Sequence, residues 1–116
     1  MKYLYKVEIE VDNEKVIREK KYMLSSVYEC IDNAFKRNDV PKIEEESIES
    51  TLVYGTTDEE LFGKIWATIM AIDKPEVMDQ LKKFIWYDYT DNTYEDIIEE
   101  SKQYREKQLR KPSTLI

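Results

Sequence analysis

Apolar and polar residues alternate regularly over positions 3–11. A period of two is typical of a half-buried β-strand, whose successive side chains point to opposite faces of a sheet. Residues 15–22 are expected to form a second strand, because Asp12 and Asn13 before them favour a turn. The sequence therefore predicts an antiparallel hairpin whose second strand is an edge protected by lysines. The apolar positions are Tyr3, Tyr5, Val7, Ile9 and Val11 in the first strand, and Val16, Ile17 and Tyr22 in the second.

Residues 26–37 are predicted to form a helix, because their apolar side chains recur at the helical period. Ser26 and Glu29 have the spacing of a capping box, in which each side chain bonds to a backbone N–H of the first turn. A third strand is expected over 47–54, with a turn at Gly55. The apolar stripe of the helix consists of Leu24, Val27, Tyr28, Ile31, Ala34 and Phe35.

The segment 57–73 admits two interpretations. Its second half, residues 64–72, reads as a buried strand because most of its side chains are apolar. Over the whole segment, however, the large apolar side chains follow the helical period, and Thr57 with Glu60 has capping-box spacing. We therefore predict a helix, although Gly63 weakens it by roughly 1 kcal/mol relative to Ala. The large apolar positions are Leu61, Phe62, Ile65, Trp66, Ile69 and Met70.

Two further helices complete the predicted elements. Asp73 and Pro75 suit the start of the first, because proline is tolerated in a first helical turn. Its apolar stripe extends to Ile85 and the helix is expected to end near Trp86. The last helix is predicted to start at Thr93.

These elements predict one α+β domain over residues 1–111, followed by a flexible tail over 112–116. We expect a three-stranded antiparallel sheet with about four helices packed mainly on one face. If residues 64–72 formed a strand, the sheet would have four strands.

The composition narrows the chemistry open to this chain. It has 116 residues and a net charge of -7, with no histidine, two glycines and one cysteine. Histidine is the usual general base and the commonest metal ligand, and glycine-rich loops bind phosphates, so we expect no cofactor, no metal and no catalysis. Cys30 excludes an internal disulfide framework and is expected to be a buried structural thiol.

The charge and the hydropathy bear on partners and location. The excess of acid argues against contact with a nucleic-acid backbone or an anionic membrane, both of which attract Lys and Arg. No apolar run has the length of a signal peptide or of a membrane helix of ~18 to 20 residues. We therefore expect a cytoplasmic protein.

The segment 84–100 is the most suggestive of function. It combines aromatic and acidic side chains, and no basic residue lies between Lys83 and Lys102. Tryptophan and tyrosine dominate protein interfaces, and carboxylates around them favour a basic partner. Packing in the core at a helix end also accounts for these aromatics, with the acids forming a solvated face. The predicted partner-binding residues are Trp86, Tyr87, Asp88, Tyr89, Asp91 and Tyr94.

The same segment bears comparison with a calcium-binding loop. With Asp88 as the first position, Glu99 falls at the twelfth, as in an EF-hand. The sixth position requires glycine for a sharp turn, and Thr93 occupies it. The spacing therefore argues against a metal site.

The leading hypothesis is a non-enzymatic protein-binding or accessory module that masks a basic site on a partner. Two alternatives remain open from the sequence. One is a carboxylate- or metal-dependent enzyme, and the other is a homo-oligomeric structural protein.

The chain also resembles a family of small, acidic bacterial proteins that are often encoded near mobile genetic elements. The resemblance covers roughly residues 3–92, and it is one of overall pattern. It implies a cytoplasmic bacterial protein with an accessory or counter-defence role, and the family supplies no activity or site residues. The segments that carry it are KYLYKVEIEV, YGTTDEELFGKIWATIMAID and FIWYD.

Overall fold

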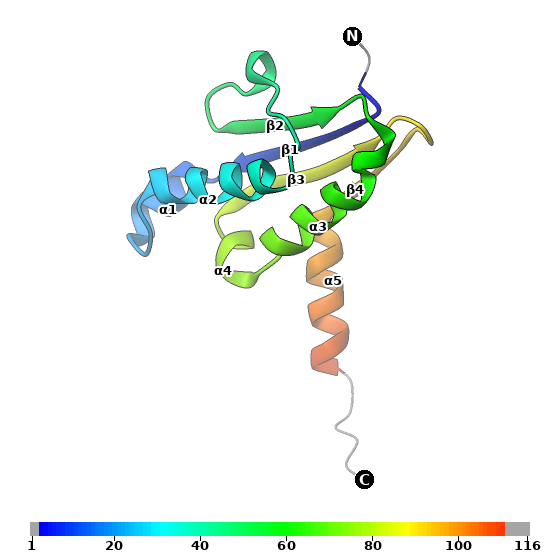
Figure 1. Ribbon diagram of the computed structural model, residues 1–116. Coiled ribbons are helices and arrows are strands. Elements are labelled where there is room, and N and C mark those ends of the chain that lie inside the picture. The colour runs from blue at the N-terminus through cyan, green and yellow to red at the C-terminus, as the bar shows by residue number, and fades with distance from the viewer. Residues whose placement is uncertain (1–2, 111–116) are drawn as a thin grey trace.

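A four-stranded antiparallel sheet forms the centre of the fold, with strand order β2-β1-β3-β4 (Figure 1). The computed structural model describes residues 3–110, and five α-helices accompany the sheet there. The predicted α+β class is confirmed. The strands are β1 (Tyr5–Val11), β2 (Thr51–Thr56), β3 (Leu81–Asp88) and β4 (Thr93–Asp96), and the helices are α1 (Asn13–Glu19), α2 (Leu24–Arg37), α3 (Phe62–Ile72), α4 (Pro75–Met78) and α5 (Ile97–Arg110).

The first predicted strand is confirmed as β1, which lies in the interior of the sheet between β2 and β3. Val7 faces the core in register with Tyr54 of β2 and Trp86 of β3. These three side chains are buried, while the alternating Glu8 lies on the opposite face and is partly exposed. The core therefore lies between one face of the sheet and helices α2 and α3, which cross in front of it in Figure 1.

The predicted second strand over 15–22 is wrong, because this segment contains helix α1. The Asp12 side chain caps the helix by accepting a hydrogen bond from the Lys15 backbone N–H. Lys20 ends it in the left-handed conformation, with φ of 54°. Val16 is buried, whereas every residue from Ile17 to Lys20 is exposed, so burial does not recur at every second residue as it would in a half-buried strand.

The predicted helix over 26–37 is confirmed, but α2 begins earlier, at Leu24, and Met23 is its N-cap. Ser26 therefore lies inside the helix and is not the capping residue. The helix predicted within 57–73 is also confirmed as α3, so the strand alternative for 64–72 is wrong. The short 3₁₀ turn that precedes α3 is capped by Asp58, which accepts a hydrogen bond from the Glu60 N–H, and Thr57 is not the cap.

The helix predicted from Pro75 to the region of Trp86 is wrong beyond its first turn. The chain leaves α4 at Met78 and enters β3 at Leu81. Apolar residues there satisfy both periods, and hydrogen bonding of β3 to β1 selects the strand. Thr93 likewise begins strand β4, and α5 starts at Ile97, where Asp96 accepts a hydrogen bond from the Glu99 N–H.

The third predicted strand lies later than expected, at Thr51–Thr56, and Gly55 is inside it rather than in a turn. The predicted tail over 112–116 lies outside the described residues. Within residues 3–110, none of the helices combines the length and the hydropathy needed to cross a membrane.

Candidate functional site

The structure divides the predicted binding residues between the two faces of the sheet. Trp86 points toward the core side and is 5 % exposed, while its neighbour Tyr87 lies on the outer face, opposite Tyr94 of β4. Adjacent residues of a strand point to opposite faces, so Trp86 and Tyr87 lie on different surfaces, although Tyr94 at the edge also lines a depression with Trp86. Two separate groups result.

The outer group is a cluster of tyrosines beside a carboxylate that already has a cationic partner. The Tyr87 ring stacks on Tyr89 at 5.9 Å between centroids and lies 6.3 Å from Tyr94. Its hydroxyl donates a 3.4 Å hydrogen bond to Glu8, and Glu8 pairs with Lys83 at 2.7 Å. Burial and the Glu8 charge raise the pKa of Tyr87, so this phenol stays neutral.

The inner group contains two large aromatics that sequence reasoning assigned to a packing stripe. Phe62 and Trp66 of α3 pack on Trp86, with ring centroids 5.1 and 6.2 Å away. Both remain well exposed, at 46 % and 50 %. The sequence signal for these two residues was their position along the helical period. They lie on a helical face offset from the one that carries the buried residues Ile65, Thr68, Ile69 and Ile72.

Carboxylates surround this aromatic group. Asp88, Asp91 and Glu95 line a depression of about 200 Å³ together with Phe62 and Trp86. The ion pairs within the described residues involve other carboxylates, so these three have no cationic partner there. We call this set the aromatic–acidic surface: Phe62, Trp66, Trp86, Asp88, Asp91 and Glu95.

The indole N–H of Trp86 is a polar group that lies beneath this surface. It is fully buried, and it meets no hydrogen-bond acceptor among the described residues. A buried donor without an acceptor costs about 1–3 kcal/mol, so structures usually satisfy such groups. Trp86 also lines the acidic depression, but its N–H is not exposed there.

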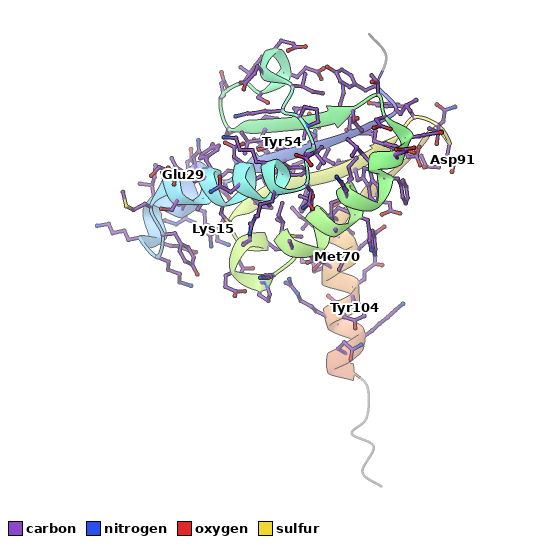
Figure 2. All side chains as sticks on the ribbon, in the orientation of Figure 1. Lys15, Glu29, Tyr54, Met70, Asp91 and Tyr104 are labelled. Atoms are coloured by element: carbon purple, nitrogen blue, oxygen red, sulfur yellow. The ribbon has the colours of Figure 1, made fainter. Side chains whose placement is uncertain are left out.

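A second hollow adjoins the aromatic–acidic surface at Trp66. It occupies about 510 Å³ between α3 and α5, and we call it the α3–α5 groove. Figure 2 shows Met70 of α3 and Tyr104 of α5 near each other below the sheet, with Asp91 at the far hairpin tip. Its lining includes Trp66, Ile69, Met70, Ile97, Glu100 and Tyr104.

Polar contacts join the two helices at the end of α3. Asp73 accepts a 2.7 Å hydrogen bond from the Ser101 hydroxyl and pairs with Arg105 at 3.7 Å. Glu100 is in a different environment, because partial burial and then the charges of Glu95 and Asp96 raise the pKa of its carboxyl. Negative potential therefore extends from β4 into the groove.

Two features considered from the sequence do not become sites. Residues 88–99 run from the end of β3 through a tight turn into β4 and α5, whereas an EF-hand loop joins two helices. Within residues 3–108, no group of three or more Cys, Asp or Glu side chains has an arrangement that could hold a metal ion. The Cys30 thiol is exposed, so the prediction that it is buried is wrong. It lies on α2, away from the inner stripe that holds Ile31.

A comparison of this chain with models of protein families, with curated proteins and with solved structures finds no match. The resemblance drawn from the sequence remains a prediction.

Proposed function

We propose that this protein is a non-enzymatic binding module that holds a basic region of a partner protein on its aromatic–acidic surface. One observation carries the proposal. Phe62 and Trp66 both pack on Trp86 and expose about half of their side chains. Phe62 and Trp86 line a depression with three carboxylates that have no cation partner within the described residues.

The chemistry of this surface suits Arg and Lys side chains. A cation near Asp91 or Glu95 gains an opposite charge, and over the exposed Phe62 ring in the same depression it gains a cation–π contact of about 0.5–2 kcal/mol. An Arg or Lys stem also covers exposed aromatic area. Both contributions favour a basic protein over an acidic or purely apolar one.

Such docking would mask the basic site that it occupies. A partner's positive surface that is covered by Asp88, Asp91 and Glu95 is closed to other anions, including phosphate backbones. The proposed biological effect is therefore competitive occlusion of a basic surface, without chemical change to the partner.

The test is quantitative affinity capture from a native lysate with two charge-matched variants. The test variant is Asp91→Asn with Glu95→Gln, which removes two charges from the surface. The control is Glu14→Gln with Glu29→Gln, which removes two charges from exposed positions on α1 and α2; Glu29 lies at the opposite end of the molecule from Asp91 in Figure 2.

We expect a basic partner that wild type and control both retain and that the test variant loses. Addition of salt should weaken the retained complex, because exposed charges are screened. A partner that binds both variants equally would contradict the proposal. Partners that are not basic, or turnover of a captured molecule, would also contradict it.

A further inference from the structure

We infer that the α3–α5 groove receives an amphipathic helix of the partner, with an aliphatic stripe facing the groove and Lys or Arg along its flank. This inference rests on the proposed function and specifies the part of the basic partner that docks.

The groove is apolar where a helix would lie. Its floor includes Ile69 and Ile97, which also belong to the core. Its walls carry Met70, 46 % exposed, and Tyr104, 65 % exposed. Core packing does not require these two wall residues, so their apolar area is available to a ligand.

The geometry fits a helix better than an extended strand. Two helices form the walls, and their side chains offer ridges and grooves for a third helix. The 11 residues of α3 extend about 16 Å at 1.5 Å per residue. Helix α5 projects away from the sheet (Figure 1). About three helical turns could lie along α3.

The charge of the groove indicates which side chains the partner helix carries on its flank. Glu100 lines the groove on α5, and Glu95 and Asp96 lie close enough to act on its carboxyl. Arg105, the cation that lines the groove, already pairs with Asp73. A partner helix with Lys or Arg facing Glu100 would supply the missing positive charge, whereas an acidic helix would be repelled.

The probe is a synthetic Leu–Lys peptide of ~18 residues, long enough for about five turns, with leucines on one helical face. A scrambled isomer of the same composition lacks that face. Both peptides lack tryptophan, so the emission of Trp66 and Trp86, the two tryptophans of the chain, reports binding. The full chain is used throughout, and NMR shift changes locate the peptide.

We expect the amphipathic isomer to bind at least about 10-fold more tightly than the scrambled one. Met70→Ala with Tyr104→Ala should weaken it by about 10-fold, as truncation of interface anchors does. The matched control, Ile17→Ala with Met23→Ala, truncates two exposed apolar residues elsewhere and should bind like wild type. Thermal melts check each fold, and Met70→Lys replaces the alanine pair if that variant unfolds.

Other outcomes separate the two proposals. Equal binding of both isomers, weakened by Asp91→Asn with Glu95→Gln and unaffected by the groove variant, overturns the helix and leaves the proposed function standing. Binding that no variant changes overturns both. Self-association in light scattering that the groove variant abolishes assigns the groove to a second copy and overturns the helical partner.

Discussion

The two edges of the sheet differ in how completely the chain itself covers them. At the β2 edge, every residue from Leu52 to Thr56 is buried, and the preceding segment packs over it through Ile43. At the β4 edge, every residue from Thr93 to Asp96 is exposed. Within the described residues, other segments of the chain cover the β2 edge, whereas the β4 edge is exposed to solvent.

The charges differ in the same way. Near β2, the Tyr54 hydroxyl donates to Asp32, which also approaches Lys42, and Lys6 pairs with Glu46 at 2.8 Å. Near β4, Glu95 and its acidic neighbours form no ion pair within the described residues. The comparison teaches that some carboxylates at the β2 edge have partners within the chain, whereas Asp88, Asp91 and Glu95 at the β4 edge have no cationic partner within the described residues.

The largest expected effect comes from truncating an aromatic that packs on β2, and it is compared with truncation of an aromatic in β4. Phe35 is fully buried and stacks on Tyr54 at 3.8 Å between centroids, so Phe35→Ala should destabilise the fold by about 3–5 kcal/mol. Tyr94 is 67 % exposed, so Tyr94→Ala should change stability by no more than about 0.5 kcal/mol. Urea unfolding measures both. Equal losses would mean that the β4 edge is part of the structural core.

The elements predicted correctly are those whose signal is local. The strand β1 alternates without interruption, and α2 repeats its apolar side chains every three or four residues. The strand β3 was mistaken for a helix because Leu81, Phe84 and Ile85 satisfy the helical period as well. Only its pairing with β1, 70 or more residues earlier, decides between the two, and a sequence window does not contain that pairing.

The candidate site was predicted in part for the same reason. The acids after Trp86 were recognisable from charge alone, and they do lie together at the β3–β4 turn. The placement of Trp86 and Tyr87 on opposite faces could not be predicted, because the sequence pattern indicated a helix there rather than a strand. Phe62 and Trp66 were recognised only as large apolar positions of the predicted helix, and α3 carries more of these side chains than one packed face buries.

A smaller test compares the two glycines of the chain, of which Gly55 is tightly packed in β2 and Gly63 has open space around it in α3. A Cβ on Gly55 in β2 would lie 2.8 Å from Ile43 Cδ1 and 3.0 Å from the Tyr5 carbonyl oxygen. Gly55→Ala should therefore destabilise the fold by about 1–3 kcal/mol through overpacking. Gly63 in α3 has open space around it, so Gly63→Ala should stabilise by about 0.5–1 kcal/mol. Thermal and urea unfolding should shift in opposite directions, and a shared direction would contradict the closed packing at β2.

The smallest expected effect concerns Glu100, beside the open edge. Partial burial and then Glu95 and Asp96 raise the pKa of its carboxyl above the ordinary value of 4.5. Between the ordinary and the raised pKa, the folded state binds more protons than the unfolded state, so stability falls as pH rises through this window. Glu100→Gln removes the titration, and the variant should gain stability relative to wild type as pH rises from below 4.5 toward 7.

The gain should be no more than about 0.5 kcal/mol, because the side chain is exposed and water screens it. Urea midpoints measured across this pH range give the sign. Salt at about 1 M, where the Debye length is about 3 Å, should remove the share that Glu95 and Asp96 contribute. If Glu100→Gln instead destabilises the protein at pH 7, a cation within the chain already balances this carboxylate. The open edge would then be as well compensated as the closed one, and the electrostatic reason for a basic partner would be lost.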